Sequence, residues 1–245
     1  MPTYRLDLAY VGTAFRGYAR QPGQTTVQGV LEEALFHHTG RVETYVAGRT
    51  DKGVHAEGQV VSFGVEEPVD AARVRQSLNK QLGPDIAIKG LAQVGDGFHA
   101  RFSATRRRYR YLVLARSTPD PFLAATSWHY GRSLDTTAMN DAAASFMGER
   151  DFASLCRRSG DASTTRNVLL AEWAESGDGF LEFRVEATSF CHQMVRSMVA
   201  ICVDVGNGRL EASEVAVILA ARDRNAGRGA APPHGLTLVA VDYSD

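Results

Sequence analysis

The chain has 245 residues, of which 44% are hydrophobic and 22% charged, with a formal net charge of −1 at pH 7. These values indicate a globular protein with a substantial core and argue against an indiscriminate polyanion binder. No apolar run approaches the roughly 20 residues that span a bilayer, and the N-terminal segment lacks the apolar core of a signal peptide. We therefore expect a cytoplasmic protein.

The three cysteines are Cys156, Cys191 and Cys202, and they form no C-x-x-C pair. An odd number of cysteines without metal-ligand spacing is typical of reduced thiols in a reducing compartment. We therefore expect free thiols and no structural zinc site.

The predicted elements begin with a strand over residues 4–11, where apolar and polar residues alternate. A capping box, Thr25-x-x-Gln28, predicts a helix over residues 27–38. Asp70 is expected to cap a second helix, which runs to about Leu82 and stops at Gly83-Pro84. Further strands are predicted over residues 42–47, 59–65, 86–94 and 108–115.

The second half follows a similar rhythm. Helices are predicted over residues 136–147, 191–205 and 214–221, and strands over residues 168–175, 179–187 and 236–243. Strands mixed with helices, many of them joined by short turns, favour an α+β fold with a mostly antiparallel sheet. We expect two halves, 1–118 and 119–245, that divide at Pro119-Asp120-Pro121. The first would carry the catalytic acid and a basic RNA-binding strand, and the second would complete the pocket and a dimer surface.

The first segment with a chemical signature is Gly48-Arg49-Thr50-Asp51-Lys52-Gly53-Val54-His55. In an extended segment, the side chains of Arg49 and Asp51 point to the same side and that of Thr50 points away. The two glycines let the backbone bend and let a bulky ligand approach. A cation beside a carboxylate favours its ionised form, which makes Asp51 a candidate nucleophile. The alternative is an ordinary Asp-Gly turn with its charges in solvent.

A second segment, residues 98–111, interleaves aromatic rings with guanidinium groups. From residue 101 to residue 110 it contains five arginines and no acid. Stacking of a base on an aromatic ring contributes roughly 1–3 kcal/mol, and arginines grip phosphates. The pattern therefore favours nucleic-acid binding over the alternative, a strand with a solvated arginine-rich face.

A third segment, residues 189–199, predicts a buried helix, because its apolar positions wrap most of the helix surface. An arginine in such a helix needs a partner, since an unpaired buried charge is very costly. If Arg196 serves the reaction, we expect its partner to be the Asp51 carboxylate. Another acid, or a side chain that reaches solvent, is the alternative. His192 is expected to be a hydrogen-bonded residue at the helix start.

Some familiar motifs are absent from the sequence. It contains no G-x-x-x-x-G-K-[ST], no G-x-G-x-x-G after a strand, and no H-E-x-x-H. Phosphate-loop, dinucleotide and zinc-protease functions therefore have no support.

Together these segments resemble the TruA family of tRNA pseudouridine synthases, and the likeness runs essentially from end to end. Its most specific block is Ala47-Gly48-Arg49-Thr50-Asp51-x-Gly53-Val54-His55-Ala56, followed by Gly58-Gln59-Val60. The other blocks, in the expected order, are Phe98-His99-Ala100-Arg101-Phe102, Arg108-Tyr109-Arg110-Tyr111 and Phe190-x-x-x-Met194-Val195-Arg196.

The resemblance implies the pseudouridine synthase fold, with two similar α/β-sandwich halves and a mostly antiparallel central sheet. It also implies an isomerase that converts uridine to pseudouridine at positions 38 to 40 of the tRNA anticodon arm. Such enzymes use no cofactor or metal, and they act as homodimers whose basic cleft spans both subunits.

The resemblance also assigns roles to residues. Asp51 would be the nucleophile, and Arg49 would displace the uridine from the base stack. Tyr109 would stack on the extruded base, Arg196 would pair with Asp51, and Leu236 would form a hydrophobic wall of the base pocket. The remaining expected RNA contacts are Phe98, His99, Arg101, Phe102, Arg108 and Arg110.

The chain departs from the family pattern near its start. The usual Tyr-Asp-Gly and Gly-Trp-Gln are here Tyr10-Val11-Gly12 and Gly17-Tyr18-Ala19, and Lys52 replaces a small residue. We expect this region to lie where RNA could bind. The departures motivate one alternative function, a tRNA-binding or chaperone-like homologue with weak catalysis. A third hypothesis, an RNA hydrolase that uses Asp51 and His55, lacks a second carboxylate or a metal site.

Overall fold

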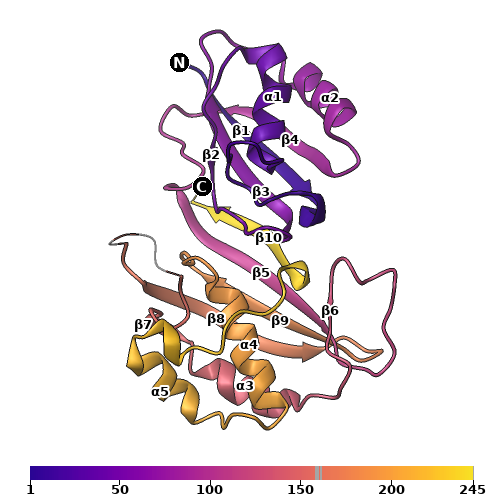
Figure 1. Cartoon of the computed structure of the whole chain (residues 1–245). Helices are drawn as coiled ribbons and strands as arrows, with labels where there is room; N and C mark the ends of the chain where they lie inside the picture. The colour runs from indigo at the N-terminus through magenta and orange to yellow at the C-terminus, as the bar shows by residue number, and fades with distance from the viewer. Residues whose placement is uncertain (158–159, 161, 245) are drawn as a thin grey trace. The chain divides into compact units, whose positions relative to one another are not determined.

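The computed structural model describes residues 1–157, 160 and 162–244 (Figure 1). The chain divides into two compact units, one formed by residues 1–105 with the segment from Thr237 onward, and the other by Arg106–Leu236. The predicted halves instead meet at residue 118. The two divisions differ because β5 pairs with β9 of the second unit, before residue 118, and because the last strand, β10, returns to pair with β3 of the first unit. The roles assigned to the halves 1–118 and 119–245 stay predictions.

The first unit contains a sheet with the strand order β4-β1-β3-β10, in which only the β3–β10 pair is parallel. The short strand β2 pairs with β3. Helices α1 and α2 lie side by side against this sheet (Figure 1). The bounds are β1 Thr3–Tyr10, α1 Val27–Thr39, β2 Tyr45–Val46, β3 His55–Gly64, α2 Ala71–Leu82, β4 Ile86–Val94 and β10 Leu236–Tyr243.

The alternation predicted for the first strand is confirmed. Tyr4, Leu6, Leu8 and Tyr10 are buried and the residues between them are half-buried. The helix that Asp70 caps is also confirmed, since its carboxylate accepts from the Arg73 amide. The predicted capping box is wrong by one residue. Thr26, not Thr25, is the N-cap of α1, and its hydroxyl accepts from the Gly29 amide.

The second unit contains a sheet with the order β5-β9-β8-β7, in which successive strands are antiparallel, and β6 pairs parallel with β5. Helices α3 and α4 pack on each other, and the Asn140 amide ties α3 to the backbone of Trp173 in β8. The bounds are β5 Ala104–Leu114, β6 Trp128–His129, α3 Thr136–Ala144, β7 Gly148–Asp151, β8 Thr165–Glu175, β9 Phe180–Ala187, α4 Met194–Gly206 and α5 Glu214–Ala221.

The α+β class with mostly antiparallel pairing is confirmed in both units. Several boundaries differ from the prediction. The strands predicted over residues 42–47, 59–65 and 168–175 are β2 Tyr45–Val46, β3 His55–Gly64 and β8 Thr165–Glu175, and α3 ends at Ala144 rather than at residue 147. Strand β5 begins at Ala104 rather than at residue 108, and near its start the Thr105 hydroxyl donates to the Asp242 carbonyl of β10 at 3.2 Å. Helix α4 begins at Met194 rather than at residue 191, since Gln193 adopts a left-handed conformation (φ 67°) that a helix does not continue through. Short elements that the sequence did not predict are the strands β6 and β7 and the 3-10 helices η1 Gly12–Ala14, η2 Arg224–Ala226 and η3 Pro233–Gly235.

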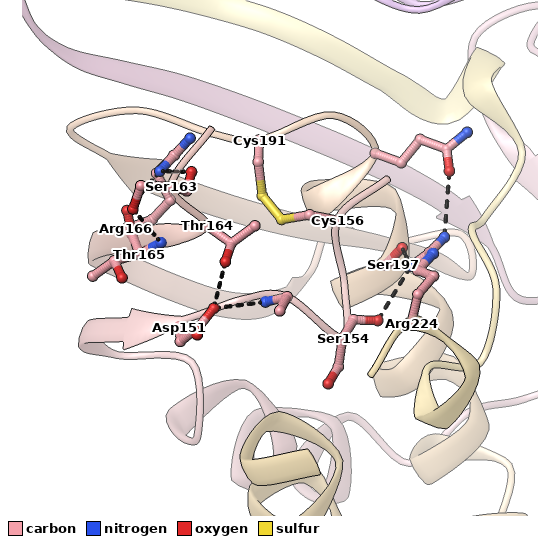
Figure 2. The surroundings of a disulfide bond; sticks show 12 residues. Asp151, Ser154, Cys156, Ser163, Thr164, Thr165, Arg166, Cys191, Ser197 and Arg224 are labelled. Atoms are coloured by element: carbon pink, nitrogen blue, oxygen red, sulfur yellow. Dashed lines mark hydrogen bonds between the residues drawn. A yellow bond between two sulfur atoms is a disulfide. The ribbon is translucent and has the colours of Figure 1, made fainter. Parts of the chain in front are cut away.

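The prediction of three free thiols is wrong for two of them. Cys156 and Cys191 form a disulfide, with Cα atoms 5.7 Å apart (Figure 2). Only Cys202 is free, and burial raises the pKa of its thiol to about 12. The sequence could not show this pair, because the two cysteines are 35 residues apart and only the packing of the second unit brings them together. Among the described residues, no helix is both long and apolar enough to cross a membrane.

Candidate active site

The turn that carries Asp51 lies between β2 and β3 in the first unit. Exposure alternates along it, since Arg49 is exposed, Thr50 is 7% exposed and Asp51 is half-buried. This alternation places Thr50 on the core side and the two charged residues on the opposite side of the extended backbone. The turn therefore presents a carboxylate and a cation together.

Backbone hydrogen bonds hold this turn to the unit. The Thr50 carbonyl accepts from the Tyr18 amide at 3.0 Å, and the Asp51 carbonyl accepts from the Val54 amide at 3.1 Å. Gly17 adopts φ 105°, a conformation that favours glycine, and an added Cβ would lie 3.2 Å from the Thr50 carbonyl oxygen. The Gly17-Tyr18 segment thus packs directly against the backbone beside Asp51.

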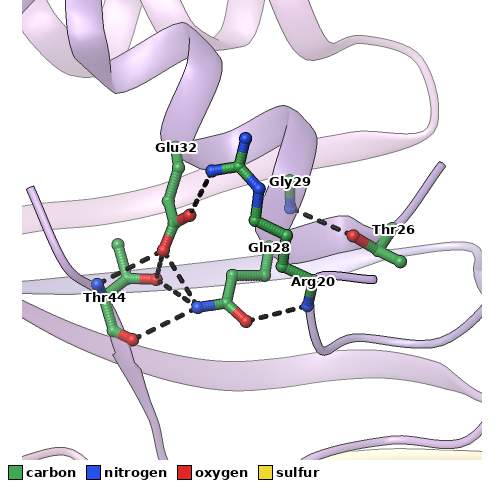
Figure 3. A network of polar contacts seen from close by, with 6 residues as sticks. All are labelled: Arg20, Thr26, Gln28, Gly29, Glu32 and Thr44. Carbon is green, nitrogen blue, oxygen red and sulfur yellow. Dashed lines mark hydrogen bonds and ion pairs between the residues drawn. The ribbon is translucent and has the colours of Figure 1, made fainter. Parts of the chain in front are cut away.

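The segment around Tyr18 is itself anchored to α1. The Tyr18 carbonyl accepts from the Gln28 amide at 2.9 Å. The Gln28 side chain donates to Glu32, and Glu32 also accepts from the Thr44 hydroxyl at 2.8 Å and from Arg20 at 3.1 Å (Figure 3). This network joins the start of α1 to the segments before and after it. Because the Tyr18 amide also bonds to the Thr50 carbonyl, the network helps to fix the position of the Asp51 turn.

The expectation that the family departures lie where RNA could bind is wrong for Tyr18. Its side chain is fully buried, with its ring 6.3 Å from that of Tyr10. Val11 is exposed and Ala19 half-buried. The Tyr18 departure is therefore a change in the core behind the turn, and it lends no support to a homologue specialised for binding.

His55 begins β3, and its side chain is 4% exposed. Its Nδ1 accepts a hydrogen bond from the Gly12 amide at 3.0 Å. Gly12 has room for no side chain, since an added Cβ would lie 2.0 Å from the Val54 carbonyl oxygen. This buried histidine holds backbone in place, which speaks against its use as the acid or base of a hydrolase.

A group of aromatic rings follows β4 in the first unit. The His99 ring lies 4.8 Å from that of Tyr45 and 4.4 Å from that of Phe102, and the Arg101 guanidinium lies over Phe102 at 5.5 Å. Phe102 is 76% exposed and Tyr45 is 42% exposed. These side chains form an exposed aromatic row, defined here as Tyr45, His99, Arg101 and Phe102. The sequence did not single out Tyr45, because it lies far from the others along the chain.

Phe98 does not belong to the aromatic row. It is half-buried, with its ring 4.9 Å from that of Tyr243, and the Arg5 guanidinium lies 5.9 Å from its centre. Tyr243 in turn donates to the Ala100 carbonyl at 2.8 Å. Phe98 therefore fixes the last strand against this segment.

In the second unit, the arginine-rich strand β5 separates its side chains by face. Arg107, Tyr109 and Tyr111 are buried, whereas Arg108 and Arg110 are half-buried on the other face. The segment has no acid in its sequence, but the sheet supplies acids from β9. Glu186 lies opposite Arg108 and pairs with Arg106 at 3.0 Å, and Glu182 lies opposite Leu112. The basic face is therefore partly neutralised by the neighbouring strand.

Tyr109, Arg196 and Leu236 also lie in the second unit. Tyr109 is 9% exposed and meets the ring of Phe190 edge to face at 5.1 Å. The half-buried Arg196 donates from Nε to the Ala231 carbonyl at 2.7 Å. Leu236 is buried at the start of β10. Arg49 and Asp51 belong to the first unit, whereas Tyr109, Arg196 and Leu236 belong to the second.

Arg224 is a residue that sequence reasoning missed. Its guanidinium donates to the Ser154 carbonyl, to the Ser197 hydroxyl at 2.9 Å and to the Gln193 amide oxygen at 3.3 Å (Figure 2). Burial lowers the pKa of Arg224, and the charge of Arg196 lowers it further. Arg224 thus ties the start of α4, which carries Arg196, to two other segments. The sequence gave no signal of this, because Arg224 stands in a polar loop that also contains Arg222 and Arg228.

Burial also lowers the pKa of His234. The positive charge of Arg196 lowers it further, whereas a hydrogen bond with the Ser127 backbone opposes the shift. Arg196, Arg224 and His234 therefore make a basic environment around the start of α4. No group of His, Cys, Asp and Glu suited to hold a metal ion occurs among the described residues.

The chain is similar to known proteins over nearly its full length. A family model described as tRNA pseudouridine synthase matches residues 8–103 and 142–244. A tRNA pseudouridine synthase A from Frankia casuarinae is 43% identical, with 98% of this chain and 88% of that protein covered. Its counterpart from Bacillus subtilis is 38% identical, covering 98% and 99%, and that from Pseudothermotoga lettingae is 37% identical, covering 99% and 100%. This chain belongs to the tRNA pseudouridine synthase family.

Proposed function

We propose that the chain is an isomerase that converts uridine to pseudouridine at positions 38 to 40 of the tRNA anticodon stem-loop, with Asp51 as the nucleophile. One observation carries the proposal within this family. The turn between β2 and β3 buries Thr50 and leaves Arg49 and Asp51 on the opposite side. A carboxylate held on a rigid turn beside a cation is suited to attack an electron-poor carbon.

The reaction requires several linked changes in the substrate. The N1–C1′ glycosidic bond breaks, the base rotates, and C5 joins C1′, while the C5 hydrogen leaves as a proton and N1 gains one. A carboxylate stabilises or traps a developing sugar cation, as in glycoside hydrolysis. The three routes open to Asp51 are attack at C1′, addition at C6 and assistance through a glycal. Each requires a pocket that retains the cleaved base.

The other residues take the roles that the family resemblance implies. Extrusion of a base from the stack costs a few kcal/mol, which contacts of Arg49 and Tyr109 with RNA offset. The proposed role of Arg196 is to pair with the Asp51 carboxylate, and that of Leu236 is to bound the base. Phe98, His99, Arg101, Phe102, Arg108 and Arg110 are the proposed RNA contacts. Phe98 has the weakest support, because it packs against Tyr243.

We also propose that the chain acts in the cytoplasm as a homodimer. Several exposed arginines make an extended RNA surface feasible in a chain with a net charge of −1, because local clusters rather than net charge guide RNA. No observation favours the alternative of a tRNA-binding homologue with weak catalysis.

The proposed function is tested by label release. Transfer RNA that carries tritium at uridine C5 is incubated with the wild-type chain and with Asp51→Asn. We expect tritium release by the wild type and none by the variant. Asp96→Asn, a substitution in the exposed turn after β4, is the matched control and should release label at the wild-type rate.

The position of the reaction is tested with substituted substrates. Release should disappear from tRNA in which positions 38 to 40 hold cytidine and persist when uridines elsewhere are replaced. Tight tRNA binding without release would favour the binding protein, and strand cleavage would favour the hydrolase. Label release by Asp51→Asn would remove Asp51 from the mechanism.

A further inference from the structure

A hydrogen-bonded pair on the core side of the turn connects it to the first strand. The Thr50 hydroxyl lies 2.8 Å from the Tyr10 hydroxyl, and both side chains are buried. Thr50 stands between Arg49 and Asp51 in the extended backbone. Because side chains alternate along such a backbone, holding Thr50 inward sets the direction in which its two neighbours point.

Gln59 in β3 makes the second connection, and its side chain is completely buried. Its Nε2 donates to the Gly48 carbonyl at 2.8 Å and to the Tyr10 hydroxyl at 3.3 Å, and its Oε1 accepts from the Val60 amide at 3.2 Å. A buried amide whose donor and acceptor are both bonded is held rigidly, because breaking either bond would leave a buried polar group without a partner and without water. Gln59 therefore holds the entrance of the turn as Thr50 holds its centre.

The hydrogen bonds have a consistent direction. Gln59 donates to the Tyr10 oxygen, and the Tyr10 hydroxyl can then donate to the Thr50 hydroxyl oxygen. Burial raises the pKa of Tyr10 to about 12, although its hydrogen bonds with Thr50 and Gln59 oppose the shift, so the phenol keeps its proton at neutral pH. Tyr10 is thus a hydrogen-bonding group here and not a base.

We propose that Tyr10 and Gln59 are positioning residues for the reaction, which aim the Asp51 carboxylate by holding Thr50 and Gly48. The inference rests on the proposed role of Asp51. Neither residue touches substrate. Their effect is on the orientation of the turn, and errors of about 1 Å in the placement of a reacting group cost up to about 100-fold in rate.

The decisive comparison is between Tyr10→Phe and Tyr4→Phe. Both tyrosines lie on the buried face of β1, and the Tyr4 hydroxyl bonds to the Val69 backbone, at 3.1 and 3.2 Å. Each variant loses hydrogen bonds worth about 1 kcal/mol of stability each. We expect similar falls in the melting temperature. Tyr10→Phe should lower kcat for tritium release about 10- to 100-fold with tRNA binding unchanged, and Tyr4→Phe should leave kcat unchanged.

A second set of variants covers the case in which Tyr10→Phe fails to fold. Thr50→Val removes the hydroxyl but keeps the side-chain shape, and Thr50→Ser restores the hydroxyl. We expect Thr50→Val to lower kcat and Thr50→Ser to recover most of the loss. Gln59→Met, which keeps the side-chain length without a donor, should again lower kcat with little effect on KM.

Equal kcat for Tyr10→Phe and Tyr4→Phe would overturn the inference, as would a rise in KM at constant kcat. So would equal losses in Thr50→Val and Thr50→Ser. These results are distinct from failure of the proposed function, which would appear as an inactive wild type or as an active Asp51→Asn variant.

Discussion

The Nε atom of Arg196 donates to the Ala231 carbonyl at 2.7 Å, which joins α4 to the segment that leads into β10. Tyr111 holds the same segment from β5, since its hydroxyl donates to the Pro232 carbonyl at 2.8 Å. Next to this bond, Gly235 has no room for a Cβ, which would meet the Tyr111 ring at 2.6 Å. Arg196 is therefore positioned by backbone that is itself fixed from a strand.

The first prediction concerns the geometry of Arg196. A guanidinium donates from Nε to Ala231 and still presents its two terminal nitrogens in a planar fork, whereas an ammonium is a single point charge. Arg196→Lys should therefore lower kcat by about 100-fold, a typical effect for a misplaced stabilising charge. Single-turnover tritium release measures it. Arg209→Lys, in an exposed surface pair with Asp204, is the control. Wild-type kcat in Arg196→Lys would show that only the charge matters.

The second prediction concerns the disulfide between Cys156 and Cys191. A cross-link across 35 residues restricts the unfolded chain and stabilises the fold by about 2–4 kcal/mol. In a domain of this size each kcal/mol corresponds to roughly 2–4 °C. A reductant should therefore lower the melting temperature of the wild type by about 5–15 °C and leave a Cys156→Ser/Cys191→Ser variant unchanged.

Thiol titration checks the same pair. The native oxidised chain should react with no thiol reagent, because the one free thiol, Cys202, is buried and its pKa is raised to about 12. One thiol should appear on denaturation and three after reduction. Three thiols without reductant would contradict the disulfide.

The third prediction concerns the aromatic row. Phe102→Ala should weaken tRNA binding by the loss of about 1–3 kcal/mol of base stacking, with an unchanged salt dependence. Arg101→Ala should instead lower the slope of log Kd against log salt by about 1. Phe122→Ala is the control, since Phe122 is 93% exposed outside the row. Equal effects of Phe102→Ala and Phe122→Ala would exclude stacking by this row.

The fourth prediction concerns His234. Its folded-state pKa is lowered from the ordinary 6.5, chiefly by burial, so the folded chain resists protonation more than the unfolded chain does. The stability that neutral His234 contributes is present above pH 6.5 and is lost as the pH falls through the lowered folded-state pKa. The melting temperature of the wild type should therefore fall more steeply from pH 7 to pH 5 than that of His234→Gln. The exposed His37→Gln should behave like the wild type. Parallel curves for His234→Gln and the wild type would contradict the assignment.

Several features of the fold could be predicted because their causes are local. Residues 86–94 form a strand with the predicted bounds, between the Gly83-Pro84 turn and the Gly95-Asp96-Gly97 turn. Asp70 caps α2 because its carboxylate needs only the amide three residues ahead. The cap of α1 was misplaced by one residue, because Thr25 and Thr26 have the same chemistry and tertiary contacts choose between them.

The candidate site was only partly predictable, because some of its residues meet only through tertiary contacts. Asp51 and Arg49 stand in one short block whose order already indicates the chemistry. Tyr10 and Gln59 were seen only as members of an alternating strand and of a family block. Their contacts with Thr50 and Gly48 join residues separated by 40 and 11 positions, respectively, along the chain.

The sequence by itself determined the family, the main helices and strands, and the acid on which the proposed chemistry depends. The tertiary structure alone decided that Tyr10 lies behind Thr50, that Glu186 faces the arginines of β5, and that Cys156 meets Cys191. Turn and cap preferences act over a few residues, so they can be predicted from the sequence. Pairing between strands depends on chain closure over long separations, and its partners appear only when the whole unit has packed.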